Sequence, residues 1–154
     1  MPRMLNTLAL SLCALVGAAG APVRAADTET TPAANAANAD FTAGKKAIEA
    51  KDWSGAVNAL EKAVRKEPKN ADAHNLLGYS YRWLGKMDDS FAHYRTALSL
   101  EPMHRGAHEY IGIAYLKAKQ PAKAKEHLTQ LERICGTKCE EYGDLAKAIA
   151  DYKD

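Results

Sequence analysis

Three glycines of this chain, Gly44, Gly78 and Gly112, follow one another at equal intervals. Other positions keep the same interval and the same side-chain size. The small set is Ala56, Ser90 and Ala124, and the large set is Leu60, Tyr94 and Leu128. A fixed period of this kind marks a stack of similar units, and small residues are needed where two helices approach closely. The period therefore predicts a row of helical hairpins that pack side by side.

The composition favours helices throughout. Hydrophobic residues make up 47% of the chain, but aromatic residues only 7%, because much of the apolar content is alanine. Alanine suits closely packed helices, since its side chain loses no rotamer freedom. No run of alternating β-branched residues predicts a strand. We therefore expect an all-α chain. The expected helices are 38–50, 54–66, 71–85, 88–100, 105–118, 121–134 and about 140–152.

The clearest copy of the pattern lies in residues 71–102. It reads Leu77-Gly78-x-x-Tyr81, then Ser90-x-x-x-Tyr94, Ala97 and Pro102. This resembles the tetratricopeptide repeat (TPR), whose signature has a 34-residue period. The resemblance covers residues 38–138 and implies a right-handed α-α superhelix of about three units, at 38–70, 71–104 and 105–138. The last unit of a solenoid exposes apolar surface, so residues 139–154 are expected to form a capping helix.

Residues 1–25 resemble a secretory signal peptide. Arg3 gives a positive start, and the apolar run that follows is too short to span a bilayer, which takes about 20 residues. We expect cleavage after Ala25. The protein would then be periplasmic or secreted, with no stable insertion in the membrane. Residues 26–37 are polar and rich in alanine, and we expect a flexible linker there.

The charge of the mature chain excludes some partners. Removing Arg3 and Arg24 from the 21 basic residues leaves 19, which equals the 19 acidic residues. Nucleic-acid binding needs a clustered positive field. We therefore expect no nucleic-acid partner.

Two cysteines, Cys135 and Cys139, remain after processing, and three interpretations compete. The first is a local disulfide that fixes the turn at Gly136, since thiols oxidise readily outside the cytosol. The second is a redox-active pair, although such pairs usually have two intervening residues. The third is a metal site, for which copper(I) fits best because it accepts two soft ligands. We favour the disulfide and expect no cofactor or metal; the alternative function is a thiol- or copper-handling accessory protein.

The histidines follow the repeat. His74 and His108 are separated by one full period, and so are His93 and His127. Equivalent positions in successive units explain both pairs without a metal, so we expect structural or solvated histidines. His104 and His108 are four positions apart and could share a helix face, but His104 precedes the expected helix, and no carboxylate or third metal ligand is evident.

The sequence contains no nucleophile–base pair, phosphate-binding glycine loop or paired-carboxylate motif, so no catalytic activity is expected. In TPR proteins the first helix of each unit lines a concave groove that receives a peptide or helix of a partner. The resemblance thus implies a non-catalytic scaffold that binds another protein. It places these residues in the groove: Phe41, Lys45, Glu49, Asn75, Tyr79, Arg82, Trp83, Glu109, Ile113 and Lys117.

Two details of the groove follow from the residue types. Trp83 suits the groove and the core equally, whereas Trp53 is expected in the core. Some TPR proteins bind a C-terminal carboxylate through a clamp of Lys, Asn and Arg. The matching positions here are Phe41, Lys45, Leu76, Gly106 and Tyr110. Only Lys45 keeps suitable chemistry, so such a clamp is not expected.

Overall fold

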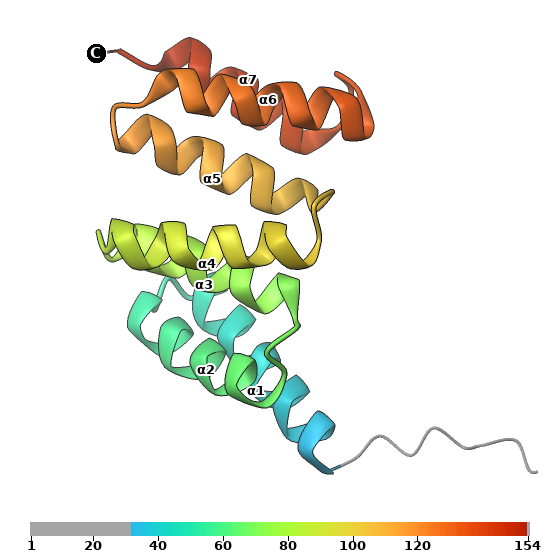
Figure 1. Ribbon diagram of the computed structural model, residues 1–154. Coiled ribbons are helices and arrows are strands. Elements are labelled where there is room, and N and C mark those ends of the chain that lie inside the picture. The colour runs from blue at the N-terminus through green and yellow to red at the C-terminus, as the bar shows by residue number, and fades with distance from the viewer. Residues whose placement is uncertain (1–31, 154) are drawn as a thin grey trace, which may run out of the picture.

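A computed structural model describes residues 32–153, with side chains from Ala36 onward. These residues form seven helices and no strand (Figure 1). The helices are α1 (Pro32–Glu49), α2 (Trp53–Lys66), α3 (Ala71–Trp83), α4 (Met87–Leu100), α5 (Arg105–Lys117), α6 (Pro121–Cys135) and α7 (Glu140–Asp151). The expected all-α repeat fold is confirmed. Among these helices, none is long and apolar enough to cross a membrane.

The start of α1 corrects one expectation. The helix begins at Pro32, so part of the segment 26–37, expected as a flexible linker, is helical. Proline is favoured in the first turn of a helix, and the alanines that follow have the highest helix propensity. Ala37 is also only 1% exposed. The expected signal peptide and the residues up to position 31 lie outside the described part of the chain.

The turns within the hairpins repeat the period in the backbone itself. Lys51, Gly85 and Lys119, which are spaced by the same interval as the repeated glycines, have φ angles of 57°, 74° and 57°. Only glycine adopts such positive angles without steric cost. The repeat thus imposes one turn geometry on all three hairpins, and only the second hairpin places glycine there.

The helices form two layers with different contacts. The inner helices α1, α3, α5 and α7 contact one another in series. The outer helices α2, α4 and α6 contact inner helices, but among the described residues no contacts join α2 to α4 or α4 to α6. The stack therefore curves around its inner layer, with α7 at one end and the start of α1 at the other (Figure 1). We call the surface formed by α1, α3, α5 and α7 the inner face.

The core lies between units as much as within them. One buried cluster joins Ala56 and Leu60 of α2 to Leu77 and Tyr81 of α3. A second cluster joins Tyr94 of α4 to Ile111 and Ala114 of α5. Each hairpin therefore completes its core with the next one, as expected of a solenoid.

The repeated glycines mark the closest helix contacts. A Cβ at Gly44 would lie 2.5 Å from Leu60 Cγ, and one at Gly78 would lie 2.6 Å from a ring carbon of Tyr94. The third glycine differs. A Cβ at Gly112 would meet Leu145 of α7 at 2.6 Å, and Leu128, the equivalent of Leu60 and Tyr94, is not among its nearest neighbours. The capping helix therefore docks directly on α5.

The repeated histidines form hydrogen-bonded pairs. His74 Nε2 lies 3.1 Å from the Pro68 carbonyl oxygen, to which it must donate, and its Nδ1 lies 3.0 Å from His93 Nδ1. In the next unit, His108 and His127 repeat the contact at 2.9 Å. Both pairs are accounted for by ring-to-ring and ring-to-carbonyl hydrogen bonds, which agrees with a structural role.

Because each pair holds a single shared proton between two rings, acid should weaken it. Burial, with His108 beside it, lowers the pKa of His127 from 6.5 to about 4. Above pH 6.5 this residue is neutral in both folded and unfolded chains, and its stabilising contribution is complete. Between pH 6.5 and 4 the unfolded chain takes up the proton first, so stability is lost as pH falls.

After allowance for partial exposure, the unchanged protein should lose on the order of 2 kcal/mol of unfolding free energy through His127 as the pH falls from 6.5 to 4. We expect His127→Gln to abolish this part of the pH dependence. The measurement is urea unfolding of both proteins at several pH values. Only the difference between their two profiles is used, because other groups titrate in the same range. A constant difference from pH 7 to pH 4 would contradict the expectation.

Candidate functional site

Four aromatic side chains gather where α2, α3 and α5 meet. The rings of Trp53 and Trp83 are stacked, with centroids 5.1 Å apart and planes at 7°. Tyr79 meets Trp53 edge-on at 5.8 Å and lies 4.9 Å from Tyr110. We call Trp53, Tyr79, Trp83 and Tyr110 the aromatic cluster. It joins two successive units through their inner helices.

Cationic side chains pack against this cluster. Lys117 Nζ lies 5.1 Å from the Trp83 ring centroid, and Arg82 Cζ lies 5.0 Å from that of Tyr79. Trp83 nevertheless remains 47% exposed. A large, half-exposed aromatic ring with cations beside it is the kind of anchor that protein interfaces use, since it offers apolar area and charge together.

Two residues expected in the groove are buried instead. Asn75 is 5% exposed and Arg82 is 6% exposed. The Oδ1 atom of Asn75 and the Nε atom of Arg82 lack hydrogen-bond partners. A buried polar atom without a partner is costly, so a water molecule or another polar group usually completes its contact. These two side chains therefore support the inner face from below.

The remaining expected groove residues spread along the inner helices. Phe41 is half-buried against the first core cluster, with Lys45 Nζ 5.9 Å from its ring. Glu49 and Lys117 are exposed, whereas Ile113 is half-buried. Of the expected set, the structure brings together Tyr79, Arg82, Trp83 and Lys117. Phe41, Lys45 and Glu49 belong to α1 and make no ring contact with the aromatic cluster.

Glu109 has a distinct environment on α5. Its burial, together with the nearby carboxylates of Asp144 and Glu141, raises the pKa of its carboxyl from 4.5 to about 7, while Arg82 opposes the shift. At neutral pH this side chain is therefore only partly ionised. The end of the inner face next to α7 thus carries more carboxylate groups than the surrounding cations neutralise.

Sequence reasoning missed two parts of this surface. Trp53, expected in the core, is half-buried and stacks on Trp83. Residues 139–154 were expected only as a capping helix, yet carboxylates of α7 lie close enough to Glu109 to raise its pKa. The period did contain a signal: Leu77, Ile111 and Leu145 are spaced by the repeat interval. The capping helix thus takes the place of the next inner helix.

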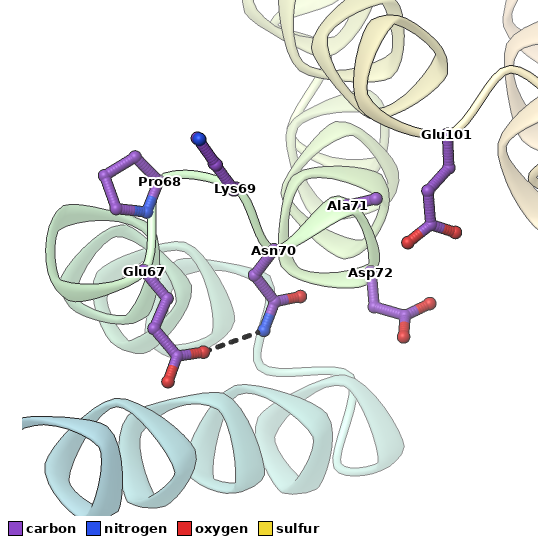
Figure 2. Close-up of a pocket in the computed structure, with 7 residues that line it drawn as sticks. All are labelled: Glu67, Pro68, Lys69, Asn70, Ala71, Asp72 and Glu101. Atoms are coloured by element: carbon purple, nitrogen blue, oxygen red, sulfur yellow. Dashed lines mark hydrogen bonds between the residues drawn. The ribbon is translucent and has the colours of Figure 1, made fainter. Parts of the chain in front are cut away.

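A hollow of about 580 Å³ lies away from the inner helices' aromatic cluster, at the loop between α2 and α3 (Figure 2). In Figure 2 the Asn70 amide donates to the Glu67 carboxylate, at 3.2 Å, and Asp72 and Glu101 stand on the other side. Asp72 also pairs with His104, at 3.1 Å. Glu67, Asn70 and Asp72 around this open hollow pair with their neighbours, so we place no functional site there.

The two cysteines lie on either side of the turn between α6 and α7. Their Cα atoms are 5.9 Å apart, a separation that a disulfide spans. Both sulfur atoms also lie within 4.8 Å of a Glu141 carboxylate oxygen. The position supports the expectation that a bond here would hold α7 at a defined angle to α6. The oxidation state in the native protein stays a prediction.

We expect native protein to contain this disulfide and no free thiol at either position. Reducing it should destabilise the fold by about 2 kcal/mol, the chain-entropy value for a short loop. Mass spectrometry after alkylation without reductant measures the content of free thiols. Urea unfolding with and without reductant measures the change in stability. Quantitative alkylation of both cysteines in fresh native protein would contradict the expectation.

Comparison with known proteins agrees with the geometry. Residues 41–100 match the family model described as tetratricopeptide repeat. No curated protein matches the chain. The match to the TPR family thus covers the first two hairpins, and the fold extends the same architecture to the rest of the described chain.

Solved structures show the same fold. The Arabidopsis OM64 TPR domain superimposes with a TM-score of 0.70 at 15% identity, covering 77% of this chain and 98% of that domain. The TPR2B domain of yeast Sti1, solved as a complex with pHsp70, gives 0.68 at 19% identity, covering 77% and 99%. MamA from Desulfovibrio magneticus gives 0.63 at 23% identity, covering 68% and 59%. The chain therefore has the TPR solenoid fold.

Proposed function

We propose that this protein is a non-catalytic scaffold that binds a segment of a partner protein on its inner face. The observation that carries the proposal is the half-exposed Trp83, stacked on Trp53 and flanked by Lys117 and Arg82. The similarity to the Sti1 domain, a structure that contains pHsp70, supports a peptide-binding role for the same fold.

The inner face suits an extended segment. Its anchor groups come from successive helices, and the ring of Tyr79 on α3 touches that of Tyr110 on α5. A chain laid across these helices would meet both units at once. Aromatic anchors supported by cations usually contribute most of the binding free energy of such an interface.

We further propose that the protein acts outside the cytoplasm, after export and cleavage of the leader at residues 1–25. The expected disulfide between Cys135 and Cys139 agrees with an oxidising compartment. The alternative, a thiol- or copper-handling role, requires both cysteines to be reduced in the native protein. Alkylation of the native protein without reductant distinguishes a structural disulfide from a thiol- or copper-handling role.

The binding proposal is tested by selecting peptides from a random phage-displayed library against the protein expressed with its own leader. Trp83→Ala should weaken the binding of the selected peptides by about tenfold or more, since loss of an aromatic anchor costs about 2 kcal/mol or more of binding free energy. Met103→Ala is the matched control, because Met103 is a 67% exposed apolar residue in the loop before α5. Equal peptide binding by Trp83→Ala and the unchanged protein would show that the inner face is not the binding site.

A further inference from the structure

The end of the inner face next to α7 is the place where acidic groups collect. Glu109 projects from α5, and Glu140, Glu141 and Asp144 come from the first two turns of α7. Leu145, packed against Gly112, fixes α7 on α5 and so brings these turns towards Glu109. We call Glu109, Glu140 and Asp144 the acidic end.

The cations nearby neutralise this group only in part. Lys147 of α7 lies close enough to Asp144 for their charges to interact, but its ammonium is paired with Asp151. Arg105 lies 3.4 Å from Glu141 and pairs with it. Arg82 is the cation that acts on Glu109, and it is shared with the rings of Tyr79 and Trp83. Within the described chain, neither Glu140 nor Asp144 takes part in an ion pair. The free protein therefore leaves Glu109 close to other carboxylates without a cation of its own.

A second observation points to a missing donor. Asn75 is buried, with only 5% of its surface exposed, yet its Oδ1 atom has no hydrogen-bond partner. Its amide lies beside Gly106, at 3.2 Å from where a Cβ would stand. Gly106 and Glu109 are three positions apart and so lie on one face of α5. The Asn75 amide of α3 therefore lies against the face of α5 that carries Glu109.

We propose that the acidic end binds an arginine side chain of the partner segment, and this inference rests on the proposed function. A guanidinium has five donors in a planar fork, so one side chain can reach several carboxylate and amide oxygens together. The charge of the acidic end is complementary to it. Arginine binding would also displace the proton that Glu109 retains near neutral pH, because a nearby cation favours the ionised carboxyl.

The distance along α5 sets the spacing of the partner's anchors. Glu109 and Lys117 are separated by about 12 Å, at about 1.5 Å per helical residue. Lys117 lies over Trp83, so Trp83, the exposed ring of the aromatic cluster, lies at about that distance along α5 from Glu109, whereas Tyr110 directly follows Glu109 and is half-buried. An extended peptide advances about 3.3 Å per residue. The partner's arginine and an aromatic residue would therefore be about four positions apart.

The test uses defined peptides rather than a natural partner. The probes are acetyl-Arg-Gly-Gly-Gly-Trp-amide and its reversed sequence, each with a control in which neutral citrulline replaces arginine. Binding to the protein, expressed with its own leader, is measured by isothermal titration calorimetry. We expect the better arginine peptide to bind about tenfold more tightly than its citrulline control at pH 8, as for a charge-assisted hydrogen bond. The preference should shrink at pH 6, where Glu109 is protonated.

Two variants test whether the acidic end causes the preference for the arginine peptide. Asp144→Asn and Glu109→Gln should each reduce the preference for arginine over citrulline, whereas Glu132→Gln, an exposed carboxylate on α6, should leave it unchanged. Equal binding of the arginine and citrulline peptides, or an unchanged preference in both acidic-end variants, would overturn the inference. Citrulline-peptide binding that Trp83→Ala removes would still uphold the proposed function. Absence of binding by all four peptides would overturn the inference as well.

Discussion

Replacing Leu145 by alanine is expected to destabilise the protein by about 2–5 kcal/mol, one of the two largest effects we anticipate. Leu145 is fully buried and lies against Gly112. Its loss leaves a cavity at the contact that holds α7 on α5, and glycine offers no side chain to fill it. Urea unfolding followed by circular dichroism gives the change in unfolding free energy.

The matched control is Leu84→Ala. Leu84 directly follows α3 and is 37% exposed, so the same change there should cost less than about 1 kcal/mol. Similar losses for the two variants would show that α7 is not held by this contact. A small effect at Leu145 would also remove the reason for placing Glu140 and Asp144 of α7 next to Glu109.

Replacing Gly78 by valine should destabilise the protein by about 3 kcal/mol, at the upper end of the usual cost of overpacking. The added Cβ would lie 2.6–2.9 Å from ring atoms of Tyr94, which is itself fully buried and cannot move aside. The separation of α3 and α4 would have to increase. The change in unfolding free energy is again the measurement.

Gly143→Val is the control for this substitution. Gly143 also lies within a helix, but a Cβ there would meet nothing within 4 Å. Valine has a higher helix propensity than glycine, so stability should stay the same or rise by roughly a few tenths of a kcal/mol. Opposite signs for the two valines are expected. A loss of the same size at both positions would mean that the repeated glycines do not mark close helix contacts.

These glycines explain why the sequence predicts the hairpins well. A position that must stay small in every unit produces a periodic pattern in the sequence. The large residue opposite it, Leu60 or Tyr94, produces a second pattern with the same period. The turns follow the same period, since positions 51, 85 and 119 share one backbone geometry, although only position 85 is glycine. Local pattern and tertiary contact agree there, so periodicity alone identifies the helices.

The sequence was less informative where the next unit decides the packing. Gly112 meets Leu145 instead of Leu128, because α7 docks on α5 as an additional inner helix. Helical spacing predicts which face Arg82 occupies, but its burial depends on how closely Tyr79 and Tyr110 of neighbouring helices approach. The contact of α7 carboxylates with Glu109 depends on the same docking. The burial of Arg82 follows from tertiary arrangement and leaves no local signal, whereas the docking of α7 is reflected only in the repeat spacing of Leu77, Ile111 and Leu145.

The most direct test of the binding face is site-specific photo-crosslinking in cells that express the protein with its own leader. A benzophenone amino acid replaces Lys117, exposed beside Trp83, or Lys125, exposed on the outer helix α6. We predict that position 117 forms a discrete adduct with a partner, that Trp83→Ala abolishes this adduct, and that position 125 forms none. An adduct from position 125 alone, or one from position 117 that persists in Trp83→Ala, would contradict binding on the inner face.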